Sequence, residues 1–167
     1  DNIDTDFGYT GKIQYAYVKM SSRFGPLTSD SHGIESDNTS SAAGRPNAVP
    51  RTRPTLINAT FDGGGVGTDG IRIRRGSAYV MQNVVVTGFG ANNGSCFNDV
   101  DTYNATFAAG AFNGTTTMSG MFFGCVKNFD DQAADPFLLS PYFNGQAENA
   151  TAANAAGLFT ANGRTLS

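Results

Sequence analysis

The chain has 167 residues, of which 40% are hydrophobic and only 15% charged, and its formal net charge is −3. Because nucleic-acid surfaces need clustered positive charge and membrane spans need about 18 consecutive apolar residues, the sequence predicts neither. The 21 glycines, the 13 phenylalanines and the absence of tryptophan are instead typical of a turn-rich β protein with little helix.

Strands built around Gly-Ile recur along the chain. Four copies can be laid over one another, at 1–6, 32–37, 69–74 and 95–101. Period-two alternation predicts that Ile71 and Ile73 face the core while Arg72 and Arg74 face solvent. In the last copy, Phe97 is expected to face inward and to be followed by a one-residue bulge.

A second kind of strand follows each Gly-Ile segment, and two of its copies match closely. Residues 55–63 align with residues 80–88, 25 positions later, with Asn58 on Asn83 and glycine on glycine. A repeat of this length that ends in glycine predicts a solenoid whose coils stack on one another. Further copies of this strand are expected at 12–19 and 118–124.

Parallel stacking predicts that Asn58 and Asn83 form a ladder inside the solenoid. Because neighbouring coils lie about 4.8 Å apart, an amide at a turn can bond both its own backbone and the amide of the next coil. An internal ladder also leaves no room for a glycan on the Asn58 sequon. The alternative is a pair of exposed loop asparagines.

Loops of unequal length are expected between the strands, and an irregular segment follows the last strand. Segment 38–54 contains three prolines and is the clearest loop, because proline is excluded from regular strand pairing. Beyond residue 126 the strand pattern weakens into a stretch that is expected to cover the open end of the coils. The sequence therefore predicts an all-β, right-handed parallel β-helix of about five to six coils over 1–128, with a C-terminal capping segment over 129–167.

The two cysteines, Cys96 and Cys125, are compatible with one disulfide. It would close a loop of about thirty residues and stabilise the fold by roughly 3 kcal/mol. Two buried free thiols are the alternative. The single histidine, His32, adjoins Gly33 at the start of a strand and belongs to no motif for nucleophilic catalysis, so a turn or surface position is expected for it.

Stacking the Gly-Ile segments brings their outward charged side chains into two columns. The first column holds Asp4, Glu35, Arg72 and Asn98 or Asp99, and the second holds Asp6, Asp37, Arg74 and Asp101. One interpretation is a solvent-screened ladder of ion pairs with no further role. The other is a calcium site, because four carboxylates on two neighbouring coils repel one another unless a cation lies among them. Its metal ligands would be Asp4, Asp6, Glu35 and Asp37.

An arginine beside a calcium-bearing groove resembles the arrangement by which polysaccharide lyases of β-helix fold abstract a proton next to a uronate carboxylate. Arg72 and Arg74 are the candidate catalytic residues for such a reaction. The sequence motifs of those lyases are not recognisable in this chain, so the comparison is an analogy of fold alone.

The order of the motifs resembles a family of bacterial secreted or surface-anchored, lipoprotein-like right-handed parallel β-helix proteins. The matching segments are 11–15, 33–38, 54–58, 69–76 and 86–90, within about residues 1–140. In that family they lie in the C-terminal part of a longer chain. The resemblance implies the fold and an extracellular or bacterial cell-surface location, and it implies no catalytic residues.

The preferred interpretation is a non-catalytic extracellular module with a structural, assembly or surface-binding role. The N-terminal edge of the coils is expected to be open, so self-association through it into a filament is one form of that role. A second interpretation is a polysaccharide lyase or hydrolase that uses the outward Asp and Arg columns. A third is a carbohydrate-binding adhesin in which Tyr15, Tyr17 or Tyr103 stacks on sugars, although core positions are more usual for such aromatics.

Overall fold

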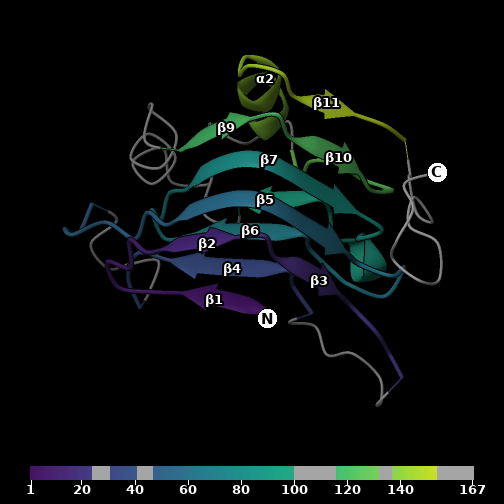
Figure 1. The fold of residues 1–167 in the computed structure, drawn as a ribbon, viewed down its shortest axis with the longest axis horizontal. Coiled ribbons are helices and arrows are strands. Elements are labelled where there is room, and N and C mark those ends of the chain that lie inside the picture. Colours follow the sequence, from purple (N-terminus) through teal and green to yellow (C-terminus); the bar gives the residue numbers. More distant parts are fainter. Residues whose placement is uncertain (24–30, 41–46, 100–115, 132–136, 154–167) are drawn as a thin grey trace.

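The structure is a computed structural model that describes residues 1–23, 31–40, 47–99, 116–131 and 137–153. The strands form two sheets, and the pairings within both are parallel (Figure 1). The predicted all-β architecture with parallel sheets is confirmed.

The first sheet has four strands, and each lies within one of the Gly-Ile segments. In sheet order they are β1 (Ile3–Thr5), β4 (Ile34–Asp37), β6 (Ile71–Arg74) and β8 (Phe97–Asp99). The register places Ile34 beside Ile71 and Ile71 beside Phe97, and all three side chains are fully buried. The predicted superposition of these segments and the inward direction of their isoleucines are therefore confirmed.

The strand β8 continues the period-two alternation, so the bulge predicted after Phe97 is wrong. Asp99 pairs with Ile73 and is buried, which makes the second inward residue of β8 a carboxylate. The same column is already polar in the first two coils, where Thr5 pairs with Ser36 and both are buried. The prediction assumed an apolar residue at a position where the interior accepts polar side chains.

The glycine before each isoleucine is required by the close approach of neighbouring coils. A Cβ atom on Gly33 would lie 2.5 Å from the carbonyl oxygen of Gly70. A Cβ atom on Gly70 would lie 2.2 Å from Val86 Cγ1 and 2.8 Å from the carbonyl oxygen of Cys96. Real Cβ atoms essentially never approach other heavy atoms so closely, so any side chain at Gly33 or Gly70 would push the coils apart.

The second sheet has seven strands, built on two long ones. They are β2 (Lys12–Gln14), β3 (Tyr17–Lys19), β5 (Thr55–Asp62), β7 (Val80–Thr87), β9 (Thr117–Ser119), β10 (Phe122–Gly124) and β11 (Ala150–Thr151). The long strand β5 pairs with both β2 and β3, and the long strand β7 pairs with both β9 and β10. Each long strand therefore matches two short strands of a neighbouring coil.

A residue in the left-handed backbone region marks the same bend in every coil of this sheet. By register these residues are Tyr15, Asn58, Asn83, Gly120 and Glu148. Their φ values lie between 53° and 61°. Asparagine and glycine tolerate this conformation best, which explains why the matched repeats carry asparagine there.

The asparagine ladder lies on the outer side of this bend. Asn83 Nδ2 donates to Asn58 Oδ1 over 2.6 Å. Asn83 is exposed and Asn58 half-buried, whereas the next residues, Ala59 and Val84, are buried. The predicted internal position is therefore wrong, because the left-handed residue turns its own side chain outward and leaves the inward position to its successor.

A short helix covers the last described coils. The helix α2 (Leu139–Asn144) receives its N-terminal cap from Asp131, whose carboxylate accepts from the backbone N–H of Leu139 over 2.6 Å and of Ser140 over 3.0 Å. Phe143 of α2 stacks on Phe123 with ring centroids 4.5 Å apart. In the described part of the chain, no helix has the length and apolar character needed to cross a membrane.

The described part of the predicted capping segment, 129–131 and 137–153, holds a further strand in addition to α2. The strand β11 pairs in parallel with β10, so the coil pattern continues past residue 129. The division into 1–128 and 129–167 stays a prediction, and residues 154–167 lie outside the described part.

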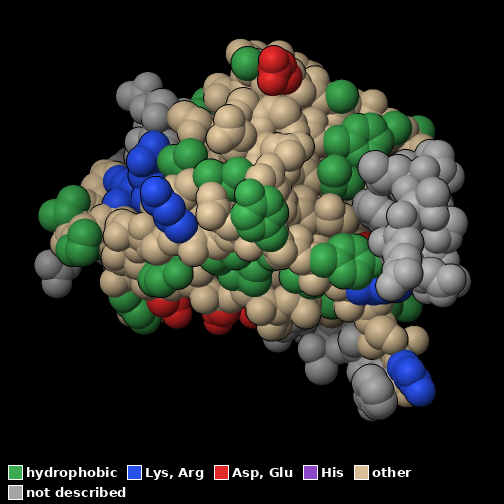
Figure 2. All heavy atoms as spheres, viewed as in Figure 1, with side chains coloured by type: hydrophobic (Ala, Val, Ile, Leu, Met, Phe, Trp, Pro, Cys, Tyr) green, Lys and Arg blue, Asp and Glu red, His purple; other side chains and the backbone are tan. Residues whose placement is uncertain are grey.

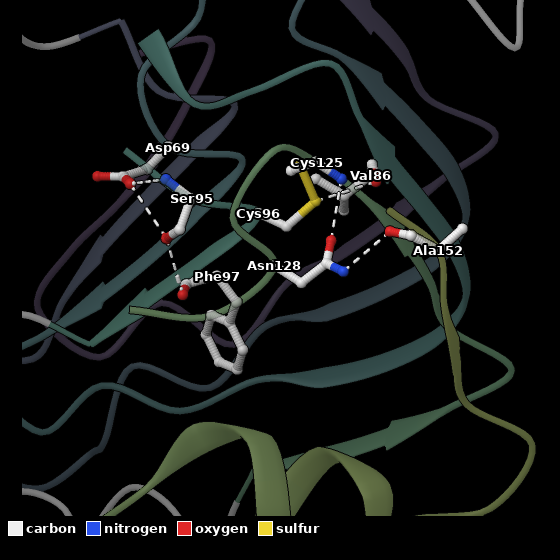
Figure 3. The surroundings of a disulfide bond; sticks show 8 residues. All are labelled: Asp69, Val86, Ser95, Cys96, Phe97, Cys125, Asn128 and Ala152. Carbon is white, nitrogen blue, oxygen red and sulfur yellow. Dashed lines mark hydrogen bonds between the residues drawn. A yellow bond between two sulfur atoms is a disulfide. The ribbon is translucent and has the colours of Figure 1, made fainter. Parts of the chain in front are cut away.

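The predicted disulfide joins the two sheets. Cys96 directly precedes β8 and Cys125 directly follows β10, and their Cα atoms are 5.5 Å apart (Figure 3). Beside it, Asn128 Oδ1 accepts from the Cys125 backbone N–H over 2.9 Å, and Asn128 Nδ2 donates to the Ala152 carbonyl over 3.0 Å. The disulfide and this amide therefore connect three successive parts of the chain.

Replacement of Cys96 and Cys125 together by serine tests the contribution of the disulfide. The loop of 29 residues predicts a loss of about 3 to 4 kcal/mol in the free energy of unfolding, measured by urea denaturation. The oxidised and reduced parent proteins are the controls. Equal stability of parent and variant would contradict this estimate.

Tyr79 belongs to a polar cluster inside the first three coils. Its side chain is fully buried, and its hydroxyl lies 3.2 Å from Thr5 Oγ1, which donates to Ser36 Oγ over 2.9 Å. Burial raises the pKa of Tyr79 to about 12. The phenol is therefore held neutral inside the fold at pH values where an unfolded tyrosine ionises.

The pH dependence of stability tests this placement. Because the pKa of Tyr79 is raised from 10.0 to about 12, its contribution is complete below pH 10 and is lost as the pH rises through the folded pKa. The expected loss is about 2 to 3 kcal/mol, read from urea unfolding curves across this interval. Tyr79→Phe should show a correspondingly shallower decline. Equal declines in the two proteins would mean that Tyr79 ionises normally.

Candidate functional site

The outer face of the four-stranded sheet carries a network of charged side chains that spans three coils. The strand β4 supplies Glu35 and Asp37, and β6 supplies Arg72 and Arg74, followed by Arg75 at the turn. In register, Glu35 lies beside Arg72 and Asp37 beside Arg74. The pleat therefore sets a carboxylate of one coil against a guanidinium of the next, as the column prediction expected.

Glu35 is held by cations from two directions. Arg74 Nη2 pairs with Glu35 Oε1, and Arg72 Nη1 lies 3.6 Å from Glu35 Oε2. Burial works to raise the pKa of Glu35, but the hydrogen bond from His32 and the two guanidinium charges outweigh it and hold that pKa below its ordinary value. The carboxylate therefore stays ionised although it is buried.

Asp37 is clamped by two arginines. Arg74 donates from Nε to Asp37 Oδ1 over 3.0 Å and from Nη2 to Asp37 Oδ2 over 2.5 Å, while Arg75 Nη1 donates to the same Oδ2 over 3.0 Å. The fork of a guanidinium matches a carboxylate in such two-point pairing. Solvent exposure was predicted for this side of the strand, yet Asp37 is buried because the arginines of the next coil lie against it.

His32 lies at the centre of the network, and its expected surface position is wrong because its side chain is fully buried. Nδ1 lies 2.7 Å from Asp1 Oδ1 and 3.1 Å from Glu35 Oε2. On the other side of the ring, Nε2 lies 3.0 Å from Arg72 Nη1 and 3.7 Å from Asp69 Oδ2. This role was not predicted from the sequence. The signal that could have indicated it is a polar residue at the same place, directly before the glycine position, in successive Gly-Ile segments.

Asp69 connects the network to polar groups of the fourth coil. Its Oδ1 accepts from the Ser95 backbone N–H over 2.8 Å and from the Ser95 hydroxyl over 3.3 Å (Figure 3). Its Oδ2 accepts from Asn98 Nδ2 over 3.1 Å. Asp69 therefore bonds the polar groups of the next coil while it faces His32 in the preceding one.

The four predicted calcium ligands meet in this region, but three arginines meet there too. Asp4 pairs in register with Glu35, and burial followed by the charges of Asp4 and Asp37 raises the pKa of Asp6. Asp4 and Asp6 are exposed, whereas Glu35 and Asp37 are buried and committed to guanidinium groups. The positive charge that the calcium prediction required is thus supplied by the protein itself, and these donors fit calcium poorly. Calcium binding stays a prediction.

The two candidate catalytic arginines are engaged in the same pairs. Arg74 contacts Glu35 and Asp37, and Arg72 contacts Glu35 and His32. A guanidinium between carboxylates is stabilised in its charged form, whereas proton abstraction requires the neutral form. Asp101, predicted in the outer column, lies outside the described residues.

The seven-stranded sheet presents a different outer surface at its first coil. Tyr15 is 79% exposed and Tyr17 is 50% exposed, although core positions were the more usual expectation. In register, Tyr17 is followed across the coils by Thr60, Val85 and Phe122, which are all half-buried. Figure 2 shows hydrophobic side chains over the centre of this face, with charged side chains toward its margins. Tyr103 lies outside the described residues.

A family model described as a pectate-lyase like beta helix domain matches residues 1–163. The chain belongs to this β-helix family. No curated protein and no solved structure matches it. Membership confirms the β-helix part of the resemblance seen in the sequence, and the bacterial, secreted and lipoprotein-like parts stay predictions.

Replacement of Arg74 by glutamine tests whether arginines take the place of a metal in this β-helix domain. Because Arg74 pairs with two buried carboxylates, its loss should lower the free energy of unfolding by about 1 to 3 kcal/mol. This is less than the loss for a fully buried pair, since the Arg74 side chain is partly exposed. Added calcium should raise the melting temperature of the variant and leave that of the parent unchanged.

The exposed Lys12→Gln substitution removes an equal charge outside the network and is the matched control. It should change neither stability nor the response to calcium. A rise in the melting temperature of the parent protein with calcium would contradict the arginine account and support the predicted calcium site.

Proposed function

We propose that the protein is a non-catalytic extracellular module that binds polysaccharide chains. The observation that carries this proposal is the pair of exposed tyrosines, Tyr15 and Tyr17, at the first coil of the seven-stranded sheet. Membership of the pectate-lyase like family supports a polysaccharide as the ligand, and the family together with the disulfide is compatible with an extracellular location.

Two exposed aromatic side chains, one in a strand and one at the bend before it, are candidates for contact with a ligand, because aromatic residues are more often largely buried. Tyrosine combines a flat apolar ring with a polar hydroxyl. A pyranose ring has the complementary character, since one face consists of C–H groups and the rim carries hydroxyls. Tyr15 and Tyr17 are two residues apart, and the strand carrying Tyr17 adjoins the next coil at Thr60.

The surroundings of the tyrosines suit a chain of sugars that runs across the coils. Gln14 and Gln82 are exposed on the same sheet. Each lies one coil away from Ile57, on opposite sides of it. Their amides both donate and accept, as hydroxyl recognition requires. Val85 adds a half-buried apolar surface beyond Thr60. Stacking and amide bonding are thus available over successive coils.

Polysaccharide cleavage is the second candidate, and the family description is what favours it. The arrangement of the charged network speaks for binding instead, because Arg72 and Arg74 are committed to carboxylates and His32 is fully buried. Assembly through the first coil is compatible with either candidate and stays a prediction.

The binding proposal predicts that Tyr15→Ala and Tyr17→Ala each weaken binding to a soluble polysaccharide at least about ten-fold, which corresponds to about 1.4 kcal/mol. Affinity gel electrophoresis against polygalacturonate and against a neutral glucan measures this effect. Phe7→Ala removes an aromatic ring that is 66% exposed in the turn between β1 and β2, and it is the matched control.

Unchanged mobility of the parent protein in every polysaccharide gel would refute the binding role. Release of unsaturated uronate product from polygalacturonate by the parent, and its loss in Arg72→Gln, would establish the cleavage candidate in its place.

A further inference from the structure

We propose that Asp1, His32 and Glu35 form a site for a divalent transition-metal ion of the zinc type. One donor atom from each residue lies within 4.8 Å of the other two. The imidazole Nδ1 is central, at 2.7 Å from Asp1 Oδ1 and 3.1 Å from Glu35 Oε2. The site uses Glu35 Oε2, whereas the close ion pair between Glu35 and Arg74 is made through Oε1. It uses none of the other three carboxylates of the predicted calcium cluster.

The donor set matches the chemistry of such ions. One imidazole nitrogen and two carboxylate oxygens are ligands that Zn²⁺ and Co²⁺ accept in tetrahedral geometry. Metal–ligand bonds of about 2.0 to 2.2 Å place neighbouring ligand atoms roughly 3.3 to 3.6 Å apart in a tetrahedron. The separations around Nδ1 are shorter, so binding of an ion requires an outward movement of the Asp1 carboxylate, whose side chain is 16% exposed.

The backbone holds two of the ligands in place while leaving an approach to the third. The Asn2 N–H donates to the His32 carbonyl over 3.1 Å, and the Gly33 N–H donates to the Asp69 carbonyl over 2.9 Å, so the segment carrying His32 is bonded to the coils on both sides. His32 and Glu35 are buried and Asp1 is exposed. Three protein ligands leave a fourth position for water on the exposed side.

The second nitrogen of the ring has a partner for the metal-bound form. With Arg72 Nη1 donating to Nε2 over 3.0 Å, the ring proton is assigned to Nδ1, where the carboxylates accept it. A metal on Nδ1 displaces that proton, and Nε2 takes up one proton, so the ring stays neutral. Asp69 Oδ2, 3.7 Å from Nε2, then faces this N–H group, as carboxylates do behind metal-bound histidines.

Arg72 opposes the ion and therefore gives the proposal a distinctive signature. Its guanidinium lies 3.6 Å from Glu35 Oε2 and also competes for Nε2 as a donor. Removal of this positive charge should strengthen metal binding, whereas removal of a ligand should weaken it. A purely structural role of Arg72 predicts no gain in metal affinity.

Isothermal titration of the untagged full chain with ZnCl₂ tests the proposal, together with the visible absorption spectrum of the Co²⁺ form. One ion per chain and an intense tetrahedral Co²⁺ band are expected. Asp1→Asn should weaken Zn²⁺ binding at least about ten-fold, and Asp69→Asn about ten-fold, because Asp69 faces Nε2 of the His32 ligand. Arg72→Gln should bind Zn²⁺ more tightly than the parent.

Asp4→Asn, at an exposed carboxylate of the same strand region, is the matched control and should bind Zn²⁺ like the parent. Asp1 is exposed, so its variant keeps the test valid if a substitution of buried His32 fails to fold. Absence of Zn²⁺ binding by the parent, or equal binding by the parent and Asp1→Asn, would overturn the proposal.

Discussion

The in-register parallel stacking of coils is the constraint on which the rest of this structure depends. Each residue of a strand lies beside the equivalent residue of the next coil, as Ile34 lies beside Ile71 and Ile71 beside Phe97. Such stacking repeats every choice of side chain, so an apolar column makes a core and a column of like charges would be self-repelling. On the outer face, Asp4 lies beside Glu35, and the pairing of Glu35 with Arg72 and of Asp37 with Arg74 offsets the repulsion between carboxylates.

The two outer faces resolve this constraint in different ways. On the four-stranded sheet, carboxylates of β4 and guanidinium groups of β6 satisfy one another between neighbouring coils, and both carboxylates are buried. On the seven-stranded sheet, the column beginning at Tyr17 carries no charge and continues through half-buried Thr60 and Val85. The proposed ligand-binding role belongs to the second face, because Tyr15 and Tyr17 expose much of their surface there.

The features that could be predicted from sequence are those fixed by periodicity. The 25-residue offset between Asn58 and Asn83 defined the register, and alternation defined the inward isoleucines. The features that could not be predicted depend on turns and on contacts between coils. The outward direction of Asn83 follows from its positive φ, and the burial of His32 follows from groups of neighbouring coils that meet around it.

The central claim is that ligand recognition belongs to the seven-stranded sheet and not to the charged network. The most direct measurement is a map of backbone amide chemical-shift changes on titration of the ¹⁵N-labelled chain with an oligogalacturonide and, in parallel, a neutral oligosaccharide. The account predicts saturable shifts for at least one of these sugars, confined to residues around 14–17, 57–60 and 82–85. Shifts concentrated at 32–37 and 69–75 would contradict it.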